Sequence, residues 1–245
     1  MRVSRMSGGS RFKNCFADLP GFGGMVKTPP GLFLVLAVFG TVGGFLHLAS
    51  EVGENETRAF DAGIVLAMRA PGDLGDPIGS RRVEETARHL TAPGGVTVLT
   101  TVALVSFGAA AFSGRAKLGL AGLAAVLTGS AATSLLKSGD NRPRPDPVEQ
   151  GTWVYNASFP SGHSTMSAVV QLTLAILLAR IQKRRRVRVF IMGVAILLMV
   201  LVGVSRVYLG VHWPTDVFAG WALGAAWAVL FWLLAMKTDP RPPGE

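Results

Sequence analysis

Residues 189–236 read VFIMGVAILLMVLVGV, then SRVYLGVHWPTD, then VFAGWALGAAWAVLFWLLAM. The first and third of these runs contain no charged residue. Each is long enough, or nearly so, to cross the roughly 30 Å hydrocarbon core of a membrane as a helix. The middle run is polar and contains Arg206, His212 and Asp216. This alternation predicts two membrane-spanning helices, joined by a short segment whose side chains can take part in chemistry.

The rest of the chain repeats the apolar pattern. Of its 245 residues, 49% are hydrophobic and 16% are charged, well below the roughly 25% charged residues of soluble domains, and the mean hydropathy is +0.41. The sequence therefore predicts an all-α, polytopic membrane protein with six transmembrane helices in one bundle. The six apolar runs lie at about 31–50, 94–112, 117–136, 164–180, 189–204 and 217–236.

The apolar runs also define the expected organisation of the chain. We expect a cytoplasmic tail at 1–30, a transmembrane domain at 31–236 and a second cytoplasmic tail at 237–245. The first run is too long, and lacks a convincing small-residue cleavage site, to be a removable signal peptide. Small residues in three runs should let helices approach closely, and they include Gly119, Gly122, Gly129, Gly220 and Gly224.

The longest polar connection, 51–93, is expected to contain two short amphipathic helices on the outer membrane surface. The evidence is apolar residues at helical spacing, namely Phe60, Ile64 and Met68, and then Val83, Ala87 and Leu90.

Loop charge predicts the orientation of the bundle. Fifteen basic residues and three acids lie in the two tails, near residue 115 and at 180–188, whereas the other connections carry nine basic residues and twelve acids. By the positive-inside rule, both termini should be cytoplasmic and the segment 205–216 should face outward. The formal net charge of +9 does not indicate nucleic-acid binding, because the basic residues separate apolar runs and form no face with interleaved aromatic residues.

The polar segment between the last two runs indicates phosphate chemistry. If a helix begins near Pro214, the carboxylate of Asp216 can turn back toward His212 and hold one ring nitrogen protonated. The other nitrogen is then a free lone pair, as a nucleophile or a general base requires. Arg206 adds a planar, permanently charged group that suits phosphate oxygens. We interpret this segment as half of a phosphate-handling site.

The second half of the site is predicted in the outward loop at 137–163. Lys137 ends the third apolar run, Arg144 follows in a loop that prolines stiffen, and PSGH at 160–163 precedes the fourth run. Ser161 is a candidate N-cap, and a helix N-terminus at this point would bind an anion. His163 would then project over that anion.

Each of these residues also has an ordinary structural explanation. Lys137 and Arg144 could anchor the ends of spans at the headgroup layer, and Ser161 could be a plain helix cap. The joint pattern favours a site, because the predicted topology brings the polar segments to one membrane face. Arg142, two residues before Arg144 in an extended strand, could point toward a second phosphate or a headgroup.

Together the polar segments resemble the three-part signature of the type 2 phosphatidic acid phosphatase superfamily. The matching motifs are Lys137-x6-Arg144-Pro145, Pro160-Ser161-Gly162-His163 and Ser205-Arg206-x5-His212-x3-Asp216. The resemblance implies that His212 is a nucleophile that forms a phosphohistidine, that Asp216 orients it, and that His163 is the general acid and base. It also implies that no metal or other cofactor is needed, and that the phosphate is bound by Lys137, Arg144, Ser161, Gly162 and Arg206.

The resemblance implies an integral membrane lipid phosphatase whose partner is a membrane lipid with a phosphate or diphosphate. The candidate substrates are bacterial envelope lipids, namely undecaprenyl diphosphate, phosphatidylglycerophosphate, phosphatidate or lipid A, and the expected location is the bacterial inner membrane with the site facing the periplasm or exterior. A vanadate-dependent haloperoxidase is the first alternative, disfavoured by six spans. A non-enzymatic lipid-binding or transport protein is the second alternative. It is disfavoured because the candidate site residues include both an acid and a nucleophile. The sequence predicts no oligomeric state.

Overall fold

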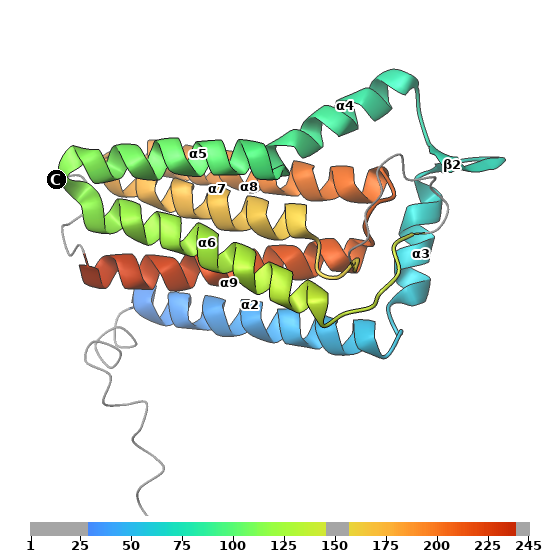
Figure 1. The fold of residues 1–245 in the computed structure, drawn as a ribbon, viewed down its shortest axis with the longest axis horizontal. Coiled ribbons are helices and arrows are strands. Elements are labelled where there is room, and N and C mark those ends of the chain that lie inside the picture. The colour runs from blue at the N-terminus through green and yellow to red at the C-terminus, as the bar shows by residue number, and fades with distance from the viewer. Residues whose placement is uncertain (1–28, 146–156, 239–245) are drawn as a thin grey trace, which may run out of the picture.

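Long helices that run along a common axis dominate the computed structural model, which describes residues 29–145 and 157–238 (Figure 1). The prediction of an all-α bundle is confirmed. The long helices are α2 (Pro29–Gly53), α5 (Val96–Ala110), α6 (Ala116–Ser138), α7 (Gly162–Ile181), α8 (Arg185–Tyr208) and α9 (Pro214–Thr238).

Five stretches of the described residues are long and apolar enough to cross a membrane. One of them, Val96–Ser138, contains both α5 and α6, and the chain reverses direction between these helices (Figure 1). The reversal lies at η2 (Ala111–Arg115), where Gly114 has a φ of 78°, a conformation that glycine adopts without steric cost. Each of the six predicted apolar runs therefore overlaps a helix of its own, while the number of membrane crossings stays a prediction.

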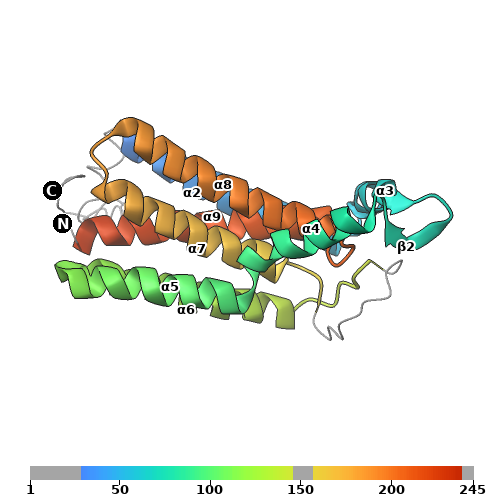
Figure 2. The same cartoon turned by 90° about the horizontal axis from the view of Figure 1, so that it is seen from above.

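Helix α7 is the centre of the bundle. It lies between α8 and the pair α5 and α6, and α9 packs along it (Figure 2). In the apolar stretch of α7, 50% of the residues are buried, whereas only 11% are buried in the apolar stretch of α2. Gly220 and Gly224 of α9 face the first turns of α7 so closely that an added Cβ would meet the α7 backbone. The predicted role of these glycines in close helix packing is confirmed for this pair.

The outer surface of the bundle is apolar. Large hydrophobic side chains are exposed on each of the long helices, which a soluble protein rarely tolerates over so wide an area. This surface fits contact with lipid, and it includes Phe39, Leu104, Leu127, Phe190, Leu197 and Phe218.

The connection between α2 and α5 contains the two predicted short helices, α3 (Arg58–Ala67) and α4 (Arg81–Thr91). Between them lies an antiparallel hairpin of β1 (Arg69–Ala70) and β2 (Asp73–Pro77), which was not predicted from the sequence. The side chain of Arg69 donates to the Tyr208 carbonyl at 2.7 Å. This bond ties the hairpin to the end of α8. The position of α3 and α4 relative to a membrane surface stays a prediction.

The three polar segments of the sequence lie at one end of the bundle. The segment with α3 and the hairpin, the residues 139–145 and 157–161 that follow α6 and the turn from α8 to α9 gather there, whereas the turns after α5 and α7 lie at the opposite end (Figures 1 and 2). The predicted domain boundaries stay a prediction, since most of the tail 1–30 and of the tail 237–245 lies outside the described residues.

Candidate active site

The N-terminus of α7 forms one wall of the site. Ser161 is the N-cap in extended conformation, with φ −65° and ψ 114°, and its hydroxyl accepts from the Ser164 backbone N–H at 3.4 Å. The N-cap prediction is confirmed. The Ser161 N–H donates to the Asp216 carbonyl at 3.0 Å, so this helix end is fixed to the start of α9. Orphan N–H groups and the helix dipole make such an end favourable for an anion.

The start of α9 forms the second wall. The helix begins at Pro214, as predicted, and Asp216 lies in its first turn. One carboxylate oxygen of Asp216, Oδ2, lies 3.4 Å from Nδ1 of His212, and it also accepts from the backbone N–H of Trp213 at 3.0 Å and from the hydroxyl of Ser158. A carboxylate beside Nδ1 favours the tautomer that carries its proton there.

The other ring nitrogen of His212 faces a cation. Its Nε2 lies 3.2 Å from Nη1 of Arg144, which also donates to the Val211 carbonyl at 2.7 Å. With the proton on Nδ1, the lone pair on Nε2 faces Nη1 of Arg144, a group that would also bind an anion. The arrangement therefore presents Nε2 as the nucleophilic atom.

Burial keeps the His212 ring uncharged. The residue is 2% exposed, and this desolvation lowers the pKa of the ring to about 3. The carboxylate of Asp216 acts in the opposite direction, and the nearby cations Arg144 and Arg206 lower the pKa further. A neutral imidazole at physiological pH has the free lone pair that attack on phosphorus requires.

Three cations, Lys137, Arg144 and Arg206, lie near His163 at the N-terminus of α7. The side chain of Lys137 passes over Gly162, where an added Cβ would lie 3.5 Å from its Cε, and its Nζ donates to the Ala157 carbonyl at 2.9 Å. Arg206 reaches the hydroxyl of Thr91 at 3.4 Å. The ring of His163 is close enough to interact electrostatically with all three, namely Lys137, Arg144 and Arg206.

Two of these cations have buried nitrogen atoms without a partner. The Nε atoms of Arg144 and of Arg206 are buried and have no hydrogen-bond partner among the described residues. Burial also lowers the pKa of the Arg144 guanidinium, and Asp216 opposes this shift. Buried donors that lack partners are costly, and each calls for an explanation such as a catalytic role.

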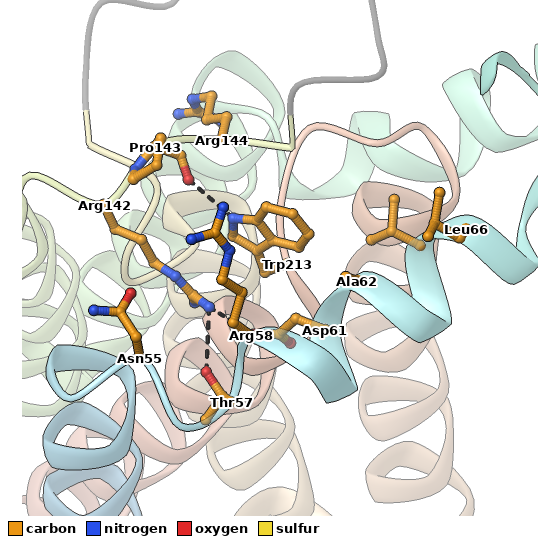
Figure 3. Close-up of a pocket in the computed structure, with 11 residues that line it drawn as sticks. Asn55, Thr57, Arg58, Asp61, Ala62, Leu66, Arg142, Pro143, Arg144 and Trp213 are labelled. Carbon is orange, nitrogen blue, oxygen red and sulfur yellow. Dashed lines mark hydrogen bonds and ion pairs between the residues drawn. The ribbon is translucent and has the colours of Figure 1, made fainter.

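Arg142 occupies a different place from the other candidate residues. Its terminal nitrogens contact the carboxylates of Asp61 and Asp216 at 2.6 and 2.5 Å. The predicted contact of Arg142 with a second phosphate or a headgroup stays a prediction, and the fork of this guanidinium is directed at the two carboxylates. Beside it lies a cavity of about 300 Å³ (Figure 3), lined among others by Asn55, Arg58, Leu66, Pro143 and Trp213.

Four polar residues that contact Asp216 or its partner Arg142 were not predicted from the sequence, namely Asp61, Ser158, Thr57 and Thr215. Asp61 lies on α3, and the sequence of this segment predicted only an amphipathic helix, with no role for Asp61. A signal was available, because Asp61 lies on the same helix face as Ile64 and Val65, where a buried acid needs a partner. Ser158 lies next to Phe159 in a loop, and nothing in the sequence pattern singles it out.

Comparisons with known proteins show which family and which fold this chain is similar to. A family model described as the PAP2 superfamily matches residues 118–239. The chain is 44% identical over 81 residues to phosphatidylglycerophosphatase B of Bacillus subtilis, and 43% identical over 68 residues to an undecaprenyl-diphosphatase of Sulfolobus acidocaldarius. These matches cover 31% and 28% of this chain, and only 37% and 29% of the relatives' own lengths.

Solved structures extend the likeness over most of the bundle. The crystal structure of a transmembrane PAP2 type phosphatidylglycerolphosphate phosphatase from Bacillus subtilis superimposes with a TM-score of 0.74 at 28% identity, covering 83% of this chain and 98% of that one. The crystal structure of Aquifex aeolicus LpxE shares the fold, with a TM-score of 0.50 at 24% identity over 64% of this chain and 88% of that one.

Proposed function

The chain belongs to the PAP2 superfamily, and on this premise we propose that it is an integral membrane lipid phosphatase that hydrolyses a terminal phosphate from a lipid phosphate or diphosphate. The observation that carries the proposal is the neutral, buried His212, whose Nε2 faces Arg144. Around it lie Lys137, Arg206 and the capped N-terminus of α7, which together suit the oxygens of one phosphate group.

In the proposed first step, Nε2 of His212 attacks phosphorus in line with the leaving oxygen. The N–P bond forms as the P–O bond to the lipid breaks. His163, which becomes protonated once the negative charge of the bound phosphate offsets the three nearby cations, gives its proton to the departing oxygen. The positive charge that His212 gains is stabilised by the adjacent Asp216 carboxylate. The products of this step are the dephosphorylated lipid and a phosphohistidine.

In the second step, a water molecule attacks the phosphohistidine. His163, now neutral, accepts a proton from the water, the N–P bond breaks, and inorganic phosphate leaves. In both steps Lys137 and Arg206, together with Arg144, the Ser161 hydroxyl and the Gly162 N–H, stabilise the negative charge on the equatorial oxygens. Preorganised cations in a water-poor site do this without reorganisation during the reaction.

The candidate substrates remain lipids whose phosphate reaches the polar end of the bundle. Names of relatives support two of them, phosphatidylglycerophosphate and a polyprenyl diphosphate, and phosphatidate and lipid A offer the same terminal phosphate. We further propose a bacterial inner membrane with both termini in the cytoplasm, so that the site faces the periplasm or exterior.

The test is phosphate release in detergent from a panel of four lipids, namely phosphatidylglycerophosphate, undecaprenyl diphosphate, phosphatidate and lipid A. The wild-type protein should hydrolyse at least one, and His212→Ala and His163→Ala should lower kcat by several orders of magnitude while the protein elutes and melts normally. His89→Ala is the matched control, because His89 is exposed on α4, and it should keep the wild-type kcat.

Vanadate distinguishes the phosphatase from the haloperoxidase alternative. As a phosphate analogue it should inhibit phosphate release competitively. Halide oxidation that appears on addition of vanadate and peroxide, or near-normal phosphatase activity in either histidine variant, would overturn the proposed function.

A further inference from the structure

A buried network of charges lies behind the proposed nucleophile. Asp61 is 1% exposed and Asp216 is 0% exposed, and the guanidinium of Arg142 lies between them. Nη2 of Arg142 contacts Oδ2 of Asp61 at 2.6 Å, and Nη1 contacts Oδ1 of Asp216 at 2.5 Å (Figure 3 shows the Asp61 side). One arginine thus bridges two carboxylates from different helices.

Asp61 also holds the start of α9 directly. Its Oδ1 accepts from the Thr215 backbone N–H at 3.0 Å, and its Oδ2 accepts from the Thr215 hydroxyl at 2.6 Å. The same hydroxyl accepts from Nη1 of Arg142 at 2.9 Å. An aspartate on α3 therefore satisfies an orphan N–H in the first turn of α9, one residue before Asp216, where negative charge is favourable.

The two carboxylate oxygens of Asp216 contact different side chains. Oδ1 is bound by Arg142, while Oδ2 lies beside Nδ1 of His212. If Asp61 lost its charge, the partly buried cation of Arg142 would have Asp216 as its one carboxylate partner among the described residues. The carboxylate would then be drawn toward Arg142 and would stabilise a charged His212 ring less well.

We propose that Asp61 is a positioning residue of the active site, which acts through Arg142 to fix the orientation and the charge of Asp216 behind His212. Asp61 lies on α3, outside the segment 118–239 that the family model matches. The inference rests on the proposed phosphohistidine chemistry, and it assigns α3 a part in catalysis beyond covering the end of the bundle.

The test compares Asp61→Asn with a control of equal charge change, Glu56→Gln, an exposed residue in the turn just before α3. The loss of a charge-assisted contact predicts a fall in kcat of roughly 10- to 100-fold for Asp61→Asn, with KM changed less than about twofold because the phosphate-binding cations are untouched. Glu56→Gln should keep both constants. The substrate is the lipid of the four-member panel that the wild-type protein hydrolyses fastest.

A double-mutant cycle separates positioning from general stability. If Asp61 acts through Arg142, the double variant Asp61→Asn with Arg142→Gln should have about the kcat of the slower single variant. Two results would overturn this inference and leave the proposed function standing. One is a double variant whose fall in kcat is the product of the two single falls, and the other is a kcat of Asp61→Asn equal to that of Glu56→Gln. A wild-type protein inactive on all four lipids would overturn both this inference and the proposed function.

A further variant covers the case in which Asp61→Asn does not fold. Arg142→Lys keeps the positive charge but loses the planar fork that bridges two carboxylates. A fall in kcat of roughly tenfold or more at unchanged KM supports the bridge. Wild-type kcat in Arg142→Lys contradicts it.

Discussion

At the scale of single residues, the burial of His212 determines how the site should respond to pH. A histidine with the usual pKa of about 6.5 would become half protonated near that pH. Because burial lowers the pKa of His212 to about 3, the free protein should keep the neutral, nucleophilic ring as the pH falls through that range. The nitrogen shifts of His212 should therefore stay constant between pH 8 and pH 5.

The measurement is NMR of the detergent-solubilised protein labelled with 15N-histidine. The His212 signal is assigned by its disappearance in His212→Asn, and imidazole added to the buffer serves as a reference that titrates normally. An inflection of the His212 shifts near pH 6.5 would contradict the buried, neutral ring.

Contacts between residues close in sequence are easier to predict than contacts between residues far apart. Asp216 lies four residues from His212, and a helix start at Pro214 brings the pair together, so spacing alone predicted their contact. Asp61 is far from both in sequence, and its contact with Arg142 depends on how α3 docks against the loop after α6. The basic residues were predicted because their spacing resembles the signature of a known family, whereas a single buried acid on a short helix matches no such pattern.

At the scale of helices, the close approach of α9 to the first turn of α7 should be sensitive to one methyl group. A Cβ on Gly220 would lie 2.9 Å from the Ser161 carbonyl oxygen. Although alanine favours helix formation over glycine, this overpacking should destabilise Gly220→Ala by about 1–3 kcal/mol and lower kcat by displacing the N-cap. The measurements are a thermal melt in detergent and phosphate release.

The matched control for Gly220→Ala is Gly193→Ala on α8. A Cβ at Gly193 meets nothing within 4 Å among the described residues, so the same change in helix propensity should leave stability equal or slightly higher. If Gly220→Ala has the same melting temperature and the same kcat as Gly193→Ala, the packing of α7 against α9 does not require this close approach.

The elements themselves were predictable to different degrees. Long apolar runs predicted the helices of the bundle, because a run of this length buries its backbone polar groups only as a helix. The hairpin between α3 and α4 was missed, although Pro71 followed by Gly72 is a turn signal and Gly72 has a φ of 94°. Its strands are mostly exposed and polar, so they lack the alternation that predicts a strand.

At the scale of the whole molecule, the grouping of polar segments at one end requires the protein to have a fixed orientation. The hairpin that carries Asp73 and the connection that carries Lys183 lie at opposite ends of the bundle (Figure 1). Loop charge predicts that the Lys183 end is cytoplasmic. A cysteine at position 73 should therefore react with a membrane-impermeant maleimide added to intact cells, and a cysteine at position 183 should react only after permeabilisation.

The labelling experiment uses the full chain with Cys15→Ser, because Cys15 is its one cysteine, and adds either Asp73→Cys or Lys183→Cys. Both side chains are exposed, so access to the reagent depends on the membrane and not on folding. The Cys15→Ser parent gives the background, and phosphate release shows that each variant is folded. Labelling of Lys183→Cys, and not of Asp73→Cys, in intact cells would reverse the orientation, and the phosphate site would then act on lipids of the cytoplasmic leaflet.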